Sequence, residues 1–576
     1  MDRVFPVYTQ TNNCHDCFKC LRQCPVKAIR LEEGHARVLP ELCVSCGLCV
    51  EVCPAKAKCI RDDRSRVEGL LASGRTVVVS LAPSWVGEFP DLPAGSLVAA
   101  LEALGFAGVG ETALGAQEVS ASTARLLQDA PPGLYLSTAC PASVEYVEKY
   151  LPDLVGSLTP LPSPLRAHAG LLREALGAET AVVFVGPCVA KKREADRWPR
   201  EVEASLTFDD LYRWLEERGL DPWSLPPTGR FLLREAEEGA LYPVEGGMTE
   251  TLRAQGGLER VRFATVSGLE ALRISLQGLD PGSLDVPCFL ECLACPGGCV
   301  NGPGSRATTP VLWRRAQVEG HAQVPEAPIR RLPTLELHQA YVSCPEDVEE
   351  PGEEAIRLAL RQVGKVSRED ELNCGGCGYD TCRAFARALV LGRAEPSMCV
   401  SHMRNQAQRK ANALLRCMPS GVVIVDRDLN IVECNEHFAV LFGEDALLAY
   451  RACEGLKGAR LDRIVPFPDL FRATLETGED LHLDLLRHKD QLFDLTLFPI
   501  DPGQTVGGVV MDVTHREIKR EQIAQRAEEV IRRNLSTVQE IACRLGEHMA
   551  ETEMLLRSIA EGYADPRTRE GGADRP

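Results

Sequence analysis

The sequence predicts a chain of several domains that mix α/β and α+β architecture, and three observations indicate this. Its 576 residues exceed what one hydrophobic core normally supports. Cysteine-dense segments at residues 14–53 and 374–399 alternate with long stretches of ordinary composition. In the longest of those stretches, short apolar runs alternate with helix-like segments, which is the pattern of buried parallel strands joined by crossover helices.

Charge and composition exclude several kinds of partner. The chain has 64 Lys and Arg against 82 Asp and Glu, a net charge of −18 that repels nucleic acid and anionic lipid. The N-terminus lacks a basic patch followed by a long apolar run, and no segment approaches the roughly 18 apolar residues of a membrane span. We therefore expect a cytoplasmic protein. In that reducing compartment, the 24 cysteines indicate metal ligands and not disulfides.

The first segment, residues 1–62, carries one cysteine motif twice. Each copy reads Cys-x2-Cys-x2-Cys-x3-Cys-Pro, so that three thiolates hold one 4Fe-4S cluster while the fourth crosses to the other cluster. The expected ligand sets are Cys14, Cys17, Cys20 and Cys53 for one cluster, and Cys43, Cys46, Cys49 and Cys24 for the second. The segment is similar to bacterial two-cluster ferredoxins. Zinc is the weaker alternative, because zinc sites do not repeat this run.

Residues 75–305 form the predicted α/β body, in which cysteines follow apolar strands. Cys140 follows LYLS, Cys188 follows AVVFVGP, and Cys295 and Cys299 lie in ECLACPGGC. Strand ends of a parallel sheet meet at one edge, so these four thiolates could hold one Fe-S cluster. Taken singly, Cys140 and Cys188 would more often be ordinary buried thiols.

Together these loops resemble the three signature loops of the FeFe-hydrogenase large subunit. They read STACP at 137–141, GPCVAKKRE at 186–194 and ECLACPGGCVNGPG at 291–304, in the order of that family. The resemblance implies that the four cysteines hold the cubane of an H-cluster, with Cys299 also bridging to its di-iron subsite. It further implies that Lys191 hydrogen-bonds a cyanide ligand there, and that maturation proteins deliver the di-iron unit. The loop of Ala82 and Pro83 either lines that site or is a plain turn.

The loops also depart from the family pattern. Ala139 stands where the enzymes of this family have a cysteine that passes protons, and a methyl group cannot do so. Losing a positioned acid or base commonly costs ~10²- to 10⁴-fold in rate. The family's relay glutamates correspond here to Ser122, Thr123 and Leu126. Gly186 and Leu293 replace two methionines, and Glu194 is expected only to support its loop.

The middle of the chain is predicted to contain a connector and a further metal site. Residues 306–352 are mixed and rich in Pro and Arg, which suits a connector, and residues 353–410 form a small domain. That domain resembles the four-cysteine 4Fe-4S domain appended to several redox proteins, with zinc as the alternative. Its expected ligands are Cys374, Cys377, Cys382 and Cys399.

The last third is predicted to be signalling machinery. Residues 411–514 resemble a PAS domain, through MPSGVVIVDRDLNIVECNEHFAVLFG and the closing MDVTHRE. Its ligand is left open, and we expect no haem, because a lone Cys434 or His437 is more often packing or surface. Residues 515–560 suit a signalling or dimerisation helix with one apolar seam, and 561–576 a disordered tail.

These features predict a regulatory, sensory FeFe-hydrogenase-like protein of low turnover, which senses dihydrogen or redox state at an H-cluster and signals through the PAS domain and C-terminal helix. The expected partners are maturation proteins, an electron carrier such as ferredoxin, a separate kinase or phosphatase, and a second copy of the chain. Two alternatives remain. One is a metabolic hydrogenase subunit that exchanges electrons with ferredoxin, and the other is an electron-transfer protein without the di-iron site.

Overall fold

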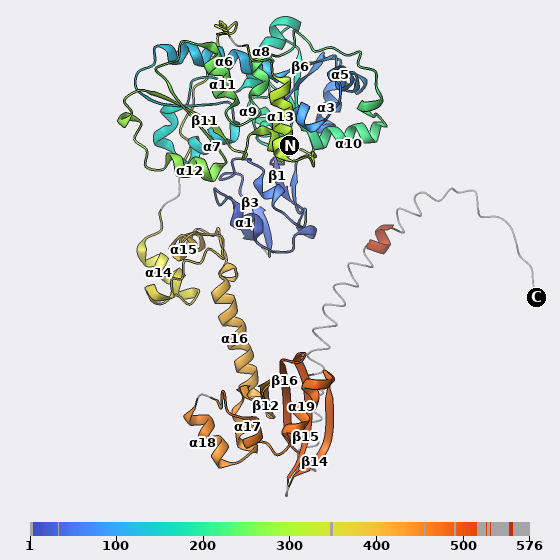
Figure 1. The fold of residues 1–576 in the computed structure, drawn as a ribbon, viewed down its shortest axis with the longest axis vertical. Helices are drawn as coiled ribbons and strands as arrows, with labels where there is room; N and C mark the ends of the chain where they lie inside the picture. The colour runs from blue at the N-terminus through green and yellow to red at the C-terminus, as the bar shows by residue number, and fades with distance from the viewer. Residues whose placement is uncertain are drawn as a thin grey trace, which may run out of the picture. The chain divides into compact units, whose positions relative to one another are not determined.

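The computed structural model divides into two compact units, residues 1–403 and 404–576, coloured along the chain in Figure 1. The residues that it describes are 4–32, 34–325, 327–345, 350–453, 455–488, 491–514, 526, 530 and 552–556. The helix predicted over 515–560 and the tail over 561–576 therefore lie almost wholly outside the described residues. No helix among the described segments is both long enough and apolar enough to span a bilayer.

The N-terminal domain contains two small antiparallel ladders and two short helices. The strand pairs are β1 (Val7–Thr9) with β4 (Lys58–Ile60), and β2 (Ile29–Glu32) with β3 (His35–Val38). The helices are α1 (Lys19–Gln23) and α2 (Leu48–Glu51). Each helix carries the third cysteine of one motif, Cys20 or Cys49. The cysteines thus pack together with buried apolar side chains of this domain, such as those of Leu21, Ile29 and Val44.

The body contains two separate parallel sheets. The four-stranded sheet has the order β6 (Gly108–Glu111), β5 (Val77–Leu81), β8 (Ala181–Gly186), β9 (Ala204–Thr207). The three-stranded sheet has the order β10 (Arg262–Ser267), β11 (Pro287–Leu293), β7 (Gly133–Leu136). Every residue of β5 and β8 is buried, as expected of apolar strands covered on both faces.

Crossover helices cover these sheets. They are α3 (Arg64–Leu71), α4 (Trp85–Glu88), α5 (Ala94–Ala103), α6 (Thr112–Gln128), α7 (Pro141–Tyr150), α8 (Pro164–Leu176), α9 (Ala190–Arg197), α10 (Phe208–Arg218), α11 (Gly247–Gln255) and α12 (Leu269–Leu276). Proline occupies the first turn of α7 and α8, where its missing N–H costs nothing. Pro141 therefore starts α7 directly after Cys140, which is the N-cap residue.

Among the described residues of the connector range 306–352 there is one α-helix, α13 (Val311–His321), which packs against α4 of the body. Its buried Arg314 donates to the carbonyl of Val300, 2.7 Å away, in the third signature loop. This helix thus belongs to the body and not to a linker. The small domain follows with α14 (Glu353–Gln362) and α15 (Cys382–Val390), which pack through Ala359, Leu360 and Ala386, and α16 (Val400–Cys417) begins directly after Cys399.

The second unit is built on one antiparallel sheet. Its order is β13 (Ile431–Cys434), β12 (Gly421–Asp426), β16 (Thr505–Asp512), β15 (Gln491–Asp501), β14 (Leu481–His488). The accompanying helices are α17 (Glu436–Leu441), α18 (Glu444–Ala452) and α19 (Pro468–Thr477). Phe438, Phe471 and Phe493 are buried at the centre of its core.

Candidate functional site

The three signature loops converge because each follows a strand. Cys140 lies after β7, Cys188 after β8 and Cys295 after β11, so one strand belongs to the four-stranded sheet and two to the three-stranded sheet. Carboxyl ends of parallel strands are the usual place for a cofactor. Here the edges of both sheets contribute thiols to one point.

These loops bring the four expected thiols together around one enclosed cavity. Cys140, Cys188, Cys295 and Cys299 line it, with small neighbours such as Ala142, Ala294 and Gly302. Burial, and to a smaller extent the nearby Cys140 thiol, raise the pKa of the Cys188 thiol to about 11. Four thiols around one cavity fit a cubane, because iron coordinates the thiolate form that a low-dielectric site otherwise disfavours.

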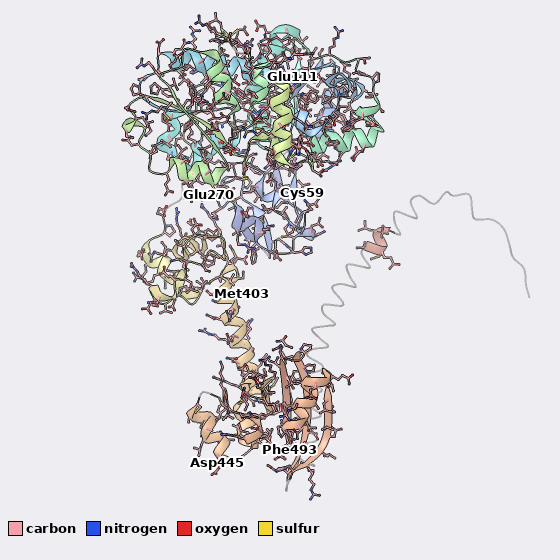
Figure 2. The ribbon with its side chains drawn as sticks, viewed as in Figure 1. Cys59, Glu111, Glu270, Met403, Asp445 and Phe493 are labelled. Atoms are coloured by element: carbon pink, nitrogen blue, oxygen red, sulfur yellow. The ribbon has the colours of Figure 1, made fainter. Side chains whose placement is uncertain are left out.

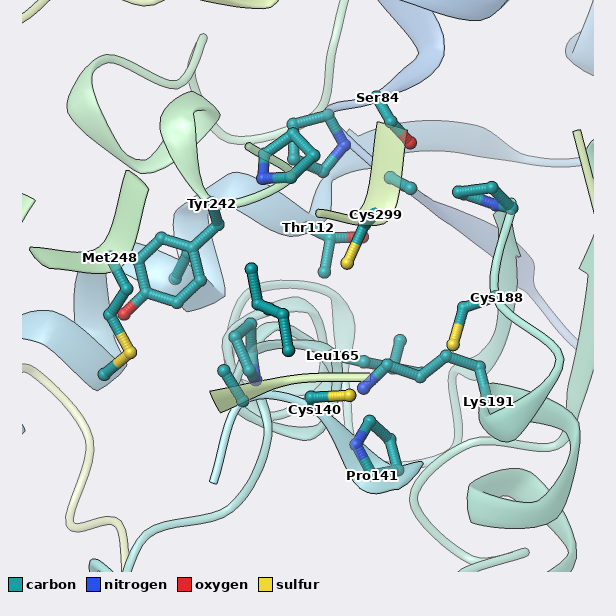
Figure 3. Close-up of a pocket in the computed structure, with 18 of the residues that line it drawn as sticks. Ser84, Thr112, Cys140, Pro141, Leu165, Cys188, Lys191, Tyr242, Met248 and Cys299 are labelled. Carbon is teal, nitrogen blue, oxygen red and sulfur yellow. The ribbon is translucent and has the colours of Figure 1, made fainter. Parts of the chain in front are cut away.

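A second, apolar cavity of about 90 Å³ adjoins the first and shares the thiols of Cys140, Cys188 and Cys299 with it (Figure 3). Ala82 and Pro83 line this cavity. Of the two alternatives for this loop, its position agrees with the one that the resemblance implies and not with a plain turn away from the site. Ala139 and Leu293 line it as well. The space beside Cys299 is therefore the place where a di-iron subsite would fit.

Lys191 reaches the same cavity from α9. Its Nζ donates to Ser163 Oγ at 2.9 Å and to Glu194 Oε2 at 2.7 Å, and all three side chains are buried. Glu194 thus does more than support its loop, because it fixes the position of the lysine cation. Lysine has three N–H donors, so one remains beyond these two bonds for a group in the cavity.

One polar atom at this cavity lacks a partner among the described residues. Ser84 lines the cavity, and its buried Oγ makes no hydrogen bond there. A buried hydroxyl without a partner is costly, so a bound group with acceptor atoms fits this position. Together with the thiols and Lys191, this orphaned hydroxyl shows that the residues present fit an H-cluster.

The positions at which a proton relay is expected to be missing have the following surroundings. Ala139 presents only a methyl group to the cavity. The hydroxyl of Thr123 donates to the carbonyl of Val119, 2.7 Å away in its own helix, and Thr123 is not among the residues that line the cavity. At Gly186, a Cβ would lie 2.5 Å from Phe184 Cζ, so the phenylalanine ring takes the space that a longer side chain would need. Phe184 itself lines the cavity.

Glu291, the carboxyl group that lines the cavity, was not singled out by the sequence analysis. It is 1% exposed and accepts hydrogen bonds from Thr249 N at 2.9 Å and Thr249 Oγ1 at 2.8 Å. Burial raises its pKa above that of an ordinary glutamate. An acidic residue inside the apolar run of β11 was the signal that could have found it.

The N-terminal cysteines group as the crossed motif predicts. The Cys20 thiol lies near those of Cys53, Cys14 and Cys17, each of which raises its pKa after the larger effect of burial. In the other group, the pKa of the Cys43 thiol is raised to about 12 by burial first and then by Cys24. Burial first, and then the thiols of Cys43 and Cys24, also raise the pKa values of Cys46 and Cys49. The fourth cysteine of each motif thus joins the other group.

The second of these groups lies close to the body. Gly47 adopts φ +79°, and a Cβ there would lie 2.3 Å from Pro303 Cγ in the third signature loop. Only glycine permits this approach without displacement. As a result, Cys24 and Cys46 share one pocket with Cys295 of the body.

The third cysteine group also converges, and it packs on the N-terminal domain. Cys374, Cys377, Cys382 and Cys399 line one small cavity. Next to it, Gly378 has φ +91°, and a Cβ there would lie 2.6 Å from Leu21 Cδ2 in α1. Tyr379 is 7% exposed, and its pKa is raised to about 12 by burial first and then by Cys377, with a smaller contribution from Cys24. This tyrosine therefore lies between two cysteine groups.

In the second unit, Cys434 and His437 do not meet. The Cys434 thiol donates to the carbonyl of Gly455 at 3.1 Å, and burial raises its pKa to about 12, whereas His437 is exposed. Rings of Phe438, Phe442, Phe467 and Phe493 fill the neighbouring core. The half-buried Cys434 thus packs against this core.

Comparison with described families assigns most of the chain. The family described as "Iron only hydrogenase large subunit, C-terminal domain" matches residues 75–303, and "4Fe-4S dicluster domain" matches 13–57. The family described as "Putative Fe-S cluster" matches 370–401, and "PAS domain" matches 410–481. These matches confirm the resemblance and the expected multidomain fold class, and they make the chain an iron-sulfur protein.

Individual relatives point to two kinds of protein. The periplasmic Fe hydrogenase large subunit of Nitratidesulfovibrio vulgaris is 30% identical over 375 residues, 54% of this chain and 89% of that protein. The cytosolic Fe-S cluster assembly factor narfl of Danio rerio is 24% identical over 281 residues, 39% of this chain and 67% of its own. A solved FeFe-hydrogenase structure aligns with 49% of this chain and 99% of its own, with 18% identity and a TM-score of 0.39.

Proposed function

Because the chain belongs to the iron-only hydrogenase large subunit family, we propose that it is a sensory member of that family. In this proposal the protein detects dihydrogen, or the redox state that dihydrogen sets, at the cavity beside Cys299. The response passes to the PAS domain and the C-terminal segment. As an enzyme the protein has at most a low turnover.

One observation carries the proposal: the cavity keeps its thiols and its lysine, while Ala139 offers it only a methyl group. Fast turnover needs a positioned acid or base, worth ~10²- to 10⁴-fold in rate. Detection needs only binding and a change of state. The cysteines and Lys191, which serve binding, are present, whereas Ala139 stands at the position that would serve fast proton transfer.

The chain's own residues have distinct tasks in this proposal. Cys140, Cys188, Cys295 and Cys299 would hold an H-cluster, which when bound supplies the metal site at which dihydrogen is split into two protons and two electrons. Lys191, held by Glu194, presents a cation to anionic ligands there. The apolar side chains of Leu165 and Phe184 keep water out of the cavity.

The contact of Gly378 and Tyr379 with the N-terminal domain supports an internal route for the response. The third cysteine group touches the domain that in turn meets the body at Gly47. From the last cysteine of that group, Cys399, the chain passes directly into α16. A change of charge at a metal site can bias a neighbouring contact when its two states differ in packing.

The proposed output is read by a separate kinase or phosphatase. Supporting this, apolar residues after the PAS domain recur every three or four positions, which suits pairing with another helix. An electron carrier such as ferredoxin, maturation proteins and a second copy of the chain complete the proposed partners.

Two other functions remain candidates. A metabolic hydrogenase subunit would use the N-terminal cysteines to exchange electrons with ferredoxin, but it has no evident need of the PAS domain. A protein with cubanes and no di-iron unit is favoured by the likeness to the assembly factor narfl. The paired Lys191 and the orphaned Ser84 hydroxyl count against it, because they face a cavity that a cubane alone would not fill.

Infrared spectroscopy of the protein after treatment with maturation proteins tests the site. We expect CO and CN stretching bands, and their absence under conditions that load a standard hydrogenase would exclude the di-iron unit. The sensory role is tested by isolating the partner kinase or phosphatase and measuring its affinity and activity under dihydrogen and under argon. Equal values in both gases would contradict a sensor.

A further inference from the structure

A chain of three side chains runs from the di-iron cavity into the interior of the body. Thr112 lines the cavity, and its Oγ1 lies 2.7 Å from Ser80 Oγ. Ser80 Oγ in turn lies 2.8 Å from His168 Nδ1. The three residues come from α6, β5 and α8, separated by 32 and 88 positions in the sequence.

These three hydrogen-bonded side chains are enclosed by the protein. Ser80 and His168 are 0% exposed and Thr112 is 6% exposed. The Nε2 atom of His168 has no hydrogen-bond partner among the described residues. A polar chain that ends in an unsatisfied nitrogen is a cost to the fold, and apolar residues could have occupied all three positions. Because Thr112 lines the cavity, the hydrogen-bonded series can act on a group that is bound there.

Burial decides the charge of His168. Removal from water lowers its pKa to about 3, and no ionised group contributes to the shift. The imidazole is therefore neutral at physiological pH, with one ring nitrogen as donor and the other as acceptor.

The orphaned Nε2 decides the direction of the hydrogen bonds. Buried acceptors are left unpaired more often than buried N–H groups, so the proton belongs on Nδ1. Nδ1–H then donates to Ser80 Oγ, and the Ser80 hydroxyl donates to Thr112 Oγ1. The Thr112 hydroxyl is left to donate into the cavity.

We propose that Thr112 is a fixed, uncharged hydrogen-bond donor to an anionic ligand of the group bound in this cavity, and that Ser80 and His168 are positioning residues for it. This inference rests on the proposed function, because it needs an acceptor beside Cys299. Figure 3 shows Thr112 and Lys191 on different sides of the cavity, so the two donors address different ligand atoms. The role of Thr112 is to hold one ligand in place without a charge.

The test uses infrared spectra of the maturated full chain under argon. Thr112→Val removes the hydroxyl at nearly constant volume, so we expect one CN band to move to lower wavenumber while the CO bands move less. His168→Phe should move the same band in the same direction and broaden it, because the threonine hydroxyl loses its fixed orientation. The matched control is Thr123→Val in the same helix, whose hydroxyl is bonded to Val119 O and which should leave every band in place.

A second measurement is independent of the bound group. Nitrogen-15 NMR of histidine-labelled protein should show one of the 11 histidines as a neutral Nδ1–H tautomer that persists to low pH, and this signal should vanish in His168→Phe. An Nε2–H tautomer would reverse the chain and overturn the inference.

The outcomes separate the two proposals. Bands that are present but unchanged in Thr112→Val overturn the role of Thr112 and leave the proposed function standing. Unaltered protein without any CO or CN bands overturns the proposed function and this inference with it. Band shifts of equal size in Thr123→Val and Thr112→Val would show a general disturbance of α6, which also contradicts a specific donor.

Discussion

The two units of this protein treat their interiors in opposite ways. In the body, thiols, a lysine and a carboxyl group are buried around cavities, and Ser84 keeps a hydroxyl without a partner among the described residues (Figure 2 shows the side chains of both units). In the PAS unit, the rings of Phe442 and Phe493 stack with centroids 5.7 Å apart, and the rings of Phe438 and Phe467 pack against them. The first interior is organised for a ligand and the second for packing.

This difference assigns the two steps of a response. Buried polar groups and cavities lower stability unless a ligand satisfies them. A filled aromatic core stabilises its own fold and responds through its surfaces. In the proposed function, detection is therefore assigned to the body and contacts with other proteins to the PAS unit.

The largest expected effect is on ligand retention in the body. Cys299→Ala removes a thiol that both cavities share, so we expect complete loss of the CO and CN bands and loss of iron from this site. The matched control is Cys292→Ala, because Cys292 is also buried but donates to the carbonyl of Leu290. Retention of all bands in Cys299→Ala would show that the di-iron unit is anchored elsewhere.

The corresponding change in the packed interior should cost stability and nothing at the metal site. Phe493 is 1% exposed, so Phe493→Ala should lower the free energy of unfolding of the second unit by about 3–5 kcal/mol. Calorimetry should show that only the transition of this unit moves. The exposed Leu448 provides the control, with a change within about 0.5 kcal/mol for Leu448→Ala. A loss of cluster absorption in Phe493→Ala would contradict the prediction that this core affects stability and not the metal site.

Local motifs were enough to single out the candidate ligands of the site, because the cysteines of each motif lie only a few residues apart in the sequence. The cysteine groups, Lys191 and Ala139 all lie in runs of a few residues whose order identifies the family. Thr112, Ser80 and His168 could not be found in this way, since their contact depends on three elements far apart in the chain. The helix α13 was missed because its sequence resembles a linker, and only its packing on α4 makes it part of the body.

A smaller effect concerns acid stability of the body. The pKa of His168 is about 3 in the folded protein and about 6.5 when unfolded. Below pH 6.5 the unfolded chain binds a proton that the folded chain does not, so stability falls as the pH drops from 6.5 toward 3. Between pH 8 and pH 5 this amounts to about 2 kcal/mol. His168→Phe should lack this loss, as measured by hydrogen exchange of amides in β5 and α8; an equal loss in both proteins would contradict a neutral histidine.

The smallest expected effect concerns the apolar cavity beside Cys299, which one substitution should make more like that of a fast enzyme. Ala139→Cys places a titratable thiol at the cavity, and a positioned acid or base is worth up to ~10²- to 10⁴-fold. We expect a gain of about tenfold or less in dihydrogen turnover, because a relay needs a next acceptor. The hydroxyl of Thr123 is bonded within its own helix, and Leu126 has no proton to pass. Ala139→Ser is the matched control, since it adds a polar group that does not ionise near neutral pH. A gain of several orders of magnitude in Ala139→Cys would show that the rest of a proton path already exists and that Ala139 alone limits dihydrogen turnover. An unchanged rate with intact infrared bands would place the rate-limiting step outside proton transfer.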